Sequence, residues 1–137
     1  MSKSKLVLVS CVAIVTGLMA ARTASGDVSH TNYLTFSAPF ALPGVTLPAG
    51  TYTFEMAVPG SYDVVRVMSR DRAHVYLTAF TKRVERPRGL AANRQIVFGE
   101  APARVAPPVK AWFPIGGAIG HEFVYSAGDR RLVQGTK

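Results

Sequence analysis

The sequence predicts an all-β protein, a small antiparallel β-sandwich or partly closed barrel of about seven to eight strands after an N-terminal signal segment. Three observations predict this class. Short segments beyond residue 27 alternate apolar and polar residues with a period of two, which is the pattern of a strand with one buried face. Glycine and proline separate these segments, as they do in domains built from strands and tight turns. The same part of the chain shows no heptad repeat and no apolar periodicity that would support a helix of three turns.

The first two expected strands show the alternation most clearly. Residues 30–37 have the sequence HTNYLTFS, in which Tyr33 and Thr35 fall on one face and Leu34 and Phe36 on the other. In residues 51–56, Tyr52, Phe54 and Met56 fall on one face and polar residues on the other. Such alternation is expected of a strand that packs one face on the core and exposes the other.

Further strands are expected along the rest of the chain. They are residues 62–68, 75–80, 95–98, 109–113 and 122–126, with 131–133 as a candidate last strand. These segments are rich in Val, Tyr, Phe and Thr, which favour strands. Two long connections separate them: residues 81–94 are polar and strongly basic, and residues 99–108 are rich in proline and expected to be extended and exposed.

The expected strand 109–113 contains Trp112, the only tryptophan of the chain. Simple alternation places Trp112 and Lys110 on one face and Phe113 on the other, so both faces carry an aromatic residue. Because a large aromatic side chain buries much apolar area, we expect Trp112 to be packed and Lys110 to extend to the edge of the apolar surface.

Residues 1–26 have the order of a secretory signal peptide. Lys3 and Lys5 precede an uncharged apolar run at residues 6–21, and small residues follow at 23–26. This run of 16 residues is shorter than the roughly 20 that a membrane-spanning helix needs. We therefore expect export to the periplasm or the extracellular space, cleavage before Asp27, and no transmembrane segment in the mature chain.

Residues 27–137 are expected to form a single β domain. The segment has 111 of the 137 residues, a length suited to one core. Loss of the three basic residues of residues 1–26 lowers the net charge from +8 to +5. The only cysteine, Cys11, lies in the apolar run within a lipobox-like LVSC sequence, but the apolar run continues after it, which disfavours lipidation. The mature domain then has no disulfide, so its stability depends on packing.

One segment resembles a known family. Residues 40–54, FALPGVTLPAGTYTF, are similar to the "F…LPAGxY" signature of small exported bacterial β proteins, whose later "W…G" segment resembles residues 112–117, WFPIGG. Residues 67–71, VMSRD, resemble the hairpin that lies between these segments in the family, and GHE at 120–122 completes the match over residues 35–125. This family has no assigned activity, so the resemblance implies a compact β domain of the cell envelope and assigns no functional residue.

The LPAG segment is also interpretable on its own as a structural turn made by Leu47, Pro48, Ala49 and Gly50 and followed by Tyr52. Proline fixes φ at its position, and we expect Gly50 to adopt a positive φ that other residues tolerate poorly. Leu47 and Tyr52 would flank the turn and pack inward. Pro-Ala-Gly offers no side-chain chemistry, which favours the structural interpretation.

No residue pattern predicts catalysis, a metal or a cofactor. The three histidines, His30, His74 and His121, lack the second and third ligands of a metal site, and we expect them at the surface or at strand edges. His121 and Glu122 are adjacent on an expected strand and point to opposite faces. The G-x-S-x-G and dinucleotide-binding patterns are absent. The alternative of a small envelope hydrolase or metal-dependent enzyme remains open, because acidic residues far apart in sequence can meet in the fold.

The basic connection is the surface that the sequence offers for an interaction. Its candidate residues for contact with an anionic group are Lys82, Arg83, Arg86, Arg88 and Arg94. Runs of charge are most often solvated, but they also bind lipid headgroups, acidic polysaccharide or acidic proteins. Nucleic acid is disfavoured because the segment has no interleaved aromatic residues. The sequence thus favours a non-catalytic binding or structural module of the bacterial cell envelope and indicates no oligomeric state.

Overall fold

The computed structural model describes residues 31–58 and 60–134. It contains nine strands and one helix in this part of the chain. The strands are β1 (Thr31–Phe36), β2 (Phe40–Leu42), β3 (Val45–Leu47), β4 (Gly50–Val58), β5 (Ser61–Ser69), β6 (Val75–Glu85), β7 (Ile96–Phe98), β8 (Val109–Trp112) and β9 (Ile119–Phe123), and the helix is α1 (Ala127–Gln134). The predicted all-β class is confirmed. The predicted signal segment lies outside the described residues.

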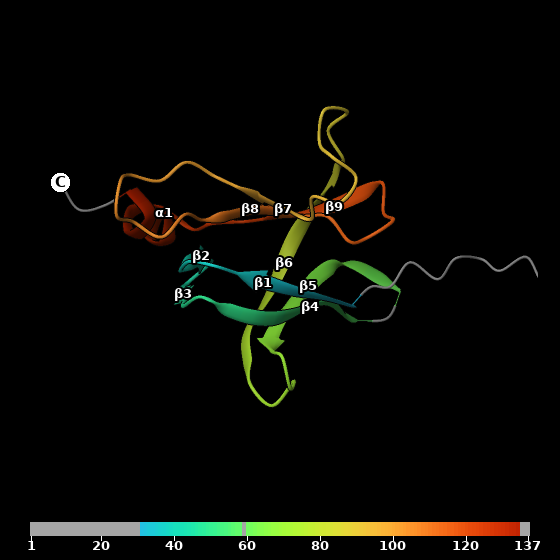
Figure 1. Cartoon of the computed structure of the whole chain (residues 1–137), viewed down its shortest axis with the longest axis horizontal. Helices are drawn as coiled ribbons and strands as arrows, with labels where there is room; N and C mark the ends of the chain where they lie inside the picture. The colour runs from blue at the N-terminus through green and yellow to red at the C-terminus, as the bar shows by residue number, and fades with distance from the viewer. Residues whose placement is uncertain (1–30, 59, 135–137) are drawn as a thin grey trace, which may run out of the picture.

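Seven strands form one antiparallel sheet with the order β1-β4-β5-β6-β9-β8-β7, and β2 and β3 form a separate hairpin. The long strand β6 belongs to two layers, because its first half pairs with β5 and residues 81–85 pair with β9. Figure 1 shows β6 passing from the layer of β1, β4 and β5 to the layer of β7, β8 and β9. The sheet is therefore a half-open barrel whose layers are continuous through β6.

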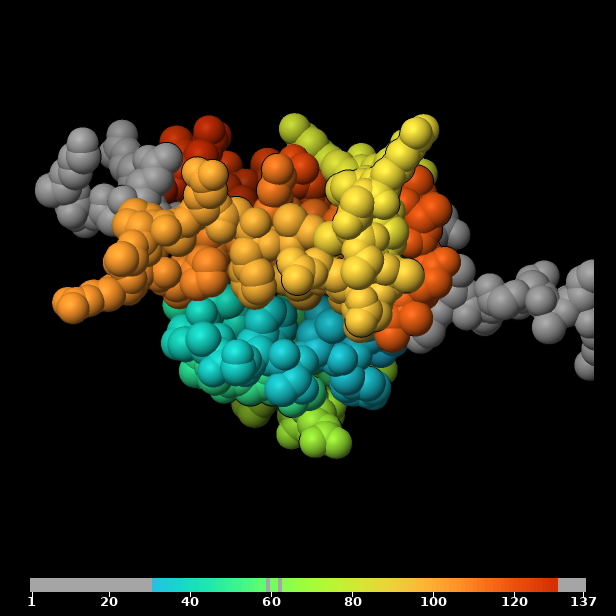
Figure 2. All heavy atoms as spheres, turned by 45° about the horizontal axis from the view of Figure 1, so that its top comes forward, coloured from blue at the N-terminus to red at the C-terminus, as the bar shows by residue number. Residues whose placement is uncertain are grey.

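The core fills the space between the two layers. Phe54 of β4 and Trp112 of β8 meet there with ring centroids 5.8 Å apart. Phe36 stacks on Phe40 of the β2–β3 hairpin at 3.7 Å, so the hairpin covers one end of the core. Figure 2 shows the side of the molecule opposite β6, where β1 and the β2–β3 hairpin (blue to cyan) meet the orange and yellow segments of the other layer.

The predicted strand set is confirmed in outline, with two corrections to its boundaries and two short strands that were not predicted. β6 continues to Glu85, so residues 81–85 of the expected basic loop are strand. β9 occupies Ile119–Phe123, earlier than the expected residues 122–126. The short strands β2 and β3 were not predicted, because three residues are too few to show an alternation.

The candidate strand at residues 131–133 was wrong, since these residues belong to α1. A capping box begins this helix. The Asp129 amide donates to Ser126 Oγ at 3.1 Å, and the Ser126 amide donates to Asp129 Oδ2 at 3.0 Å. These reciprocal bonds satisfy amides that the first helical turn leaves without partners. The sequence SAGD at residues 126–129 is thus the start of this helix.

The LPAG turn is structural in its packing, but its predicted glycine conformation was wrong. Leu47 and Tyr52 are buried, as expected, and the Tyr52 hydroxyl donates to the Pro48 carbonyl at 2.7 Å. Gly50 is the first residue of β4 and does not have a positive φ. The left-handed conformation instead occurs at Gly44, with φ +74°, between β2 and β3, where Pro43-Gly44 fits a type II turn. Gly60, between β4 and β5, also has a positive φ.

A bulge in β8 resolves the ambiguous strand around Trp112. β7 pairs Val97 with Ala111 and Phe98 with Val109, so Lys110 is an extra residue on β8. Such a bulge shifts the alternation by one residue, which lets Val109 and Trp112 both join the core. Trp112 is fully buried, as predicted, and Lys110 is exposed.

A buried ion cluster lies on the outer face of the β4–β5 layer. Glu55 of β4 is 6% exposed, and its carboxylate contacts Arg66 Nη1 at 3.4 Å and Arg72 Nη2 at 2.5 Å. Arg72 lies in the turn between β5 and β6, so its contact with Glu55 holds that turn over the face of the sheet. Two guanidinium groups thus balance one buried carboxylate.

Candidate functional site

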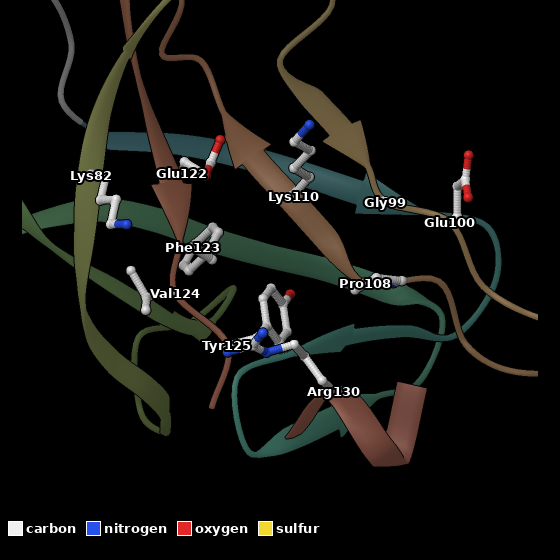
Figure 3. Close-up of a pocket in the computed structure, with 10 residues that line it drawn as sticks. All are labelled: Lys82, Gly99, Glu100, Pro108, Lys110, Glu122, Phe123, Val124, Tyr125 and Arg130. Carbon is white, nitrogen blue, oxygen red and sulfur yellow. The ribbon is translucent and has the colours of Figure 1, made fainter. Parts of the chain in front are cut away.

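The outer face of the layer formed by β6, β9 and β8 is hollowed into a depression of about 460 Å³. Figure 3 shows the side chains that line it. Its charged residues are Lys82 from β6, Lys110 from β8, Glu122 from β9, Arg130 from α1 and Glu100 from the proline-rich connection. The other lining residues are Gly99, Pro108, Phe123, Val124 and Tyr125.

Strand register explains why these charges meet. Lys82 pairs with Glu122, and opposite residues of neighbouring antiparallel strands project from the same face. Lys110 is the bulge residue of β8, so it projects differently from the flanking residues Val109 and Ala111, which are buried. The capping box that begins α1 fixes the helix at the end of β9, and Arg130 lies in its first turn.

Tyr125 forms a fixed wall of the depression. Its hydroxyl donates toward the Val109 carbonyl at 2.7 Å and the Ala41 carbonyl at 3.3 Å. Burial raises the pKa of Tyr125 well above 10, and the nearby charge of Asp129 acts in the same direction. The phenol is therefore neutral at physiological pH, and it joins the end of β9 to β8 and to the β2–β3 hairpin.

The charged side chains divide into two groups in Figure 3. The ammonium group of Lys82 and the guanidinium group of Arg130 lie toward Val124 and Tyr125, whereas Glu122 and Lys110 extend together to the other side. Glu100 lies at the far end of the depression. The space beside Val124 and Tyr125 is therefore bordered by two cations, while Glu122 is the cross-strand neighbour of Lys82 and the charge of Asp129 acts on Tyr125.

No ion pair of the described residues involves a residue that lines the depression. In the described residues the ion pairs are those of Arg66 and Arg72 with Glu55, and of Arg83 with Asp63 at 3.0 Å. Neither Lys82 nor Arg130 takes part in any of these pairs. Both cations are exposed, and positive charge in a concave surface concentrates the local field and attracts anions.

The five residues proposed from the sequence as an anionic contact do not share one surface. Lys82 lines the depression, while Arg83, the next residue of β6, projects to the opposite face and pairs with Asp63. Arg88 and Arg94 are exposed in the connection between β6 and β7. Of the five, Lys82 is the one that the depression contains.

Arg86 has a structural role in this connection. Its Nη1 atom donates to the Ala91 carbonyl at 3.2 Å and to the Arg94 carbonyl at 2.9 Å, and its Nε donates to Gly117 at 3.3 Å. The guanidinium also lies over the Phe113 ring, 5.1 Å from its centroid. Arg86 thus closes the loop and covers a buried ring, which leaves it poorly placed to bind a ligand.

The histidines differ in their exposure. His74 is exposed as expected, but His121 is 3% exposed, so its prediction as a surface or edge residue was wrong. It lies on the inner face of β9, beside Trp112 and 3.4 Å from Thr81 Oγ1. Glu122 projects to the outer face, as adjacent strand residues must. His30 lies outside the described residues, in which no three His, Cys, Asp or Glu side chains cluster as metal ligands.

Sequence reasoning did not identify Lys110, Glu122 and Arg130 as parts of one site. Two features of the sequence could have located them. The SAGD capping box predicts a helix that contains Arg130, and the aromatic residues on both faces around Trp112 indicate a bulge near Lys110. The strand register that places Lys82 opposite Glu122 is a long-range property with no local sequence signal.

Comparison with known proteins supplies no relative. Neither the protein-family models, nor the curated proteins, nor the solved structures contain a match to this chain. Of the helices that the structure describes, none has the length and apolar character needed to cross a bilayer.

Proposed function

We propose that this protein is an exported, non-catalytic binding module of the bacterial cell envelope that holds an anionic lipid headgroup in the depression of β6, β8, β9 and α1. The observation that carries the proposal is the position of Lys82 and Arg130. Two different elements bring these exposed cations to one concave surface, where both lie toward Val124 and Tyr125. Export is supported by the basic, apolar and small-residue order of residues 1–26.

An apolar neighbour favours a lipid over a polysaccharide as the source of the anionic group. The ladder between β6 and β9 ends at the pair of Thr81 and Phe123. Phe80 and Val124 are the next residues of the two segments past this pair, so they occupy adjacent positions. These side chains are 76% and 48% exposed. Basic residues combined with exposed aromatic residues suit the boundary between lipid headgroups and acyl chains.

Export is tested by the intact mass of the protein in the envelope fraction of expressing cells. We expect the mass of residues 27–137. Full-length chain recovered from the cytosol would contradict export, and full-length chain in the membrane would indicate an uncleaved anchor.

Anion binding is tested by co-sedimentation with vesicles of phosphatidylglycerol and, separately, of phosphatidylcholine. We expect binding to the anionic vesicles that weakens with salt, because counter-ions screen exposed charges beyond about 8 Å at physiological ionic strength. The double variant Lys82→Ser, Arg130→Ser should lose at least tenfold in affinity. Soluble acidic polysaccharide should compete weakly if a lipid is the ligand and fully if the acidic group alone is recognised.

The matched control removes the same charge elsewhere. Arg88→Ser and Arg94→Ser alter two exposed side chains of the basic connection, outside the depression. This variant should bind within twofold of the wild type. Equal losses in both variants would show that only net charge matters, and a larger loss in the control would place the contact in the connection between β6 and β7.

A further inference from the structure

Phe80 is the most exposed of the large apolar residues that the structure describes, at 76%. It lies in β6 where this strand leaves β5 and joins β9. Val64 of β5 is the cross-strand partner of Phe80, whereas the next residue of β6, Thr81, pairs with Phe123 of β9. The ring therefore projects from the place where the sheet passes from one layer to the other.

Phe80 is the middle member of an apolar stripe formed by Val64, Phe80 and Val124. Opposite residues of antiparallel strands project from the same face, so Val64 lies beside Phe80. On the other side of Phe80, Val124 occupies the adjacent position past the ladder between β6 and β9. Val64 is half-buried and Val124 is exposed, so the stripe offers apolar area that the protein itself does not cover.

Cations flank the apolar stripe on the side of the depression. Lys82 is the second residue after Phe80 on β6, so both side chains project from the same face, about 7 Å apart along the strand. Figure 3 shows Arg130 and the ammonium group of Lys82 both lying toward Val124. The apolar stripe and the two cations therefore belong to one continuous surface.

The carboxylates near this surface do not cancel its positive charge. Asp63 of β5 pairs with Arg83 at 3.0 Å. Glu55 is bound by two guanidinium groups. Glu122 is the cross-strand neighbour of Lys82 and is the acid that shares the surface with the cations. The local balance remains positive, as it does for the chain, which carries 16 basic and 8 acidic residues.

An anionic bilayer matches this surface better than a second copy of the protein. The headgroup region of each leaflet is about 5–7 Å thick. With β6 inclined to the membrane, the Phe80 ring reaches the acyl chains while the ammonium group of Lys82 stays among the phosphates. A symmetric dimer through the apolar stripe would instead bring Lys82 and Arg130 of both copies to one interface, where like charges repel.

We propose that the apolar stripe enters the bilayer whose headgroup the depression holds, with Phe80 as the inserted side chain. This inference rests on the proposed function, because the headgroup contact involves the flanking cations. The attraction to the membrane then has two components. Salt screens the ionic component at Lys82 and Arg130, whereas the burial of apolar area at Phe80 is not screened.

Insertion is tested with Phe80→Trp, and Tyr33→Trp is the matched control. Both positions carry exposed aromatic residues, and β1, which contains Tyr33, lies on the side opposite β6. The native Trp112 is fully buried and supplies a constant background. On addition of phosphatidylglycerol vesicles, the emission of Phe80→Trp should move to shorter wavelength and be quenched by lipids brominated on their acyl chains. The emission of Tyr33→Trp should not change.

The contribution of the ring to affinity is tested by co-sedimentation of Phe80→Ser and Tyr33→Ser with the same vesicles. Phe80→Ser should bind at least tenfold more weakly than the wild type, because it removes a large apolar group that binding buries. Tyr33→Ser should bind within twofold of the wild type. Rising salt should weaken binding of the wild type and of Phe80→Ser by the same factor. Phe80→Ser should melt within a few degrees of the wild type, since the side chain is exposed in the free protein.

Three outcomes would overturn the insertion. Vesicle binding that requires Lys82 and Arg130 but leaves the emission of Phe80→Trp unchanged would retain the headgroup site and exclude insertion. Absence of wild-type binding to phosphatidylglycerol vesicles would remove both the headgroup site and the insertion. A dimer in analytical ultracentrifugation that Phe80→Ser dissociates, without an emission change on vesicles, would assign the apolar stripe to a second copy.

Discussion

The contact between Gly120 and Phe113 allows a sharp test of the fold. Gly120 lies in β9, and a Cβ built on it would overlap the Cδ1 and Cε1 atoms of Phe113 and lie 3.0 Å from Cγ. Phe113 follows β8 and is 2% exposed. The missing side chain of Gly120 therefore provides the space in which the ring lies against the sheet, and Gly120→Ala removes that space.

The size of the effect follows from what surrounds the ring. Phe113 cannot move outward freely, because the Arg86 guanidinium covers it at 5.1 Å and is itself bonded to three loop carbonyls. Overpacking of a close-packed site costs about 1–3 kcal/mol, and alanine recovers about 0.5–1 kcal/mol relative to glycine within a strand. Because the overlap with the Phe113 ring is severe, its cost lies at the upper end of that range. We expect a net loss of about 2 kcal/mol, which lowers the Tm of a domain of this size by about 8–16 °C.

Urea unfolding followed by the fluorescence of the buried Trp112 measures this loss, and Gly50→Ala is the matched control. Gly50 is also a strand glycine without a positive φ, but its Cβ would meet the Tyr52 ring at an ordinary 3.5 Å. Gly50→Ala should therefore change the free energy of unfolding by less than about 0.5 kcal/mol. Phe113→Leu should relieve the overlap, so the double variant should be about 1 kcal/mol more stable than the sum of the single effects predicts. Equal effects of Gly120→Ala and Gly50→Ala would refute the packing argument.

Three further predictions concern other parts of the fold. Gly44→Ala should lower the free energy of unfolding in urea by about 1–2 kcal/mol, because alanine tolerates a φ of +74° poorly. This loss should exceed that of Gly50→Ala, and the reverse order would contradict the turn assignment. Because the pKa of Tyr125 is raised in the folded state, its contribution to stability is complete below pH 10 and is lost as the pH rises further. Tyr125→Phe should cost about 1 kcal/mol at pH 8 and should reduce the loss of stability at alkaline pH, measured by melting curves over a pH series. An unchanged alkaline slope would contradict this role of Tyr125. Glu55→Gln should cost about 1–2 kcal/mol in thermal unfolding. This cost is smaller than that of breaking a fully buried ion pair, because Arg66 and Arg72 remain in reach of water. A neutral result would show that the cluster adds nothing to stability.

The sequence predicted the strands whose alternation is long and regular, and it failed where structure depends on partners far along the chain. β1, β4 and β5 could be located because one face of each is buried by the same core. The second half of β6 could not, because residues 81–85 are stabilised as a strand by pairing with β9, about forty residues later. Gly50 was assigned the wrong conformation because LPAG has the composition of a turn, while the hydrogen bond from Tyr52 to Pro48 and the start of β4 determine its backbone.

The same limit applies to the candidate site. Lys82 was proposed from its basic neighbourhood, but the residues that surround it in the fold come from β8, β9 and α1. Sequence neighbours on a strand project to opposite faces, which separates Lys82 from Arg83. Charge density along the chain therefore overestimated the basic surface of the connection and gave no information about the depression.

The shared strand β6 explains how the barrel closes on its other side. Because β6 belongs to both layers, the sheet is continuous there, and its terminal strands β1 and β7 meet on the opposite side. Hydrogen bonds from the Ile115 and Ala41 amides, and the contact between the Phe36 and Phe98 rings, hold that seam in place of a strand ladder. A headgroup bound beside Lys82 and Arg130 stabilises the folded state by mass action, so it should raise Tm. Because it contacts side chains of β6 and α1, it should leave local amide exchange at β1 and β7 unchanged.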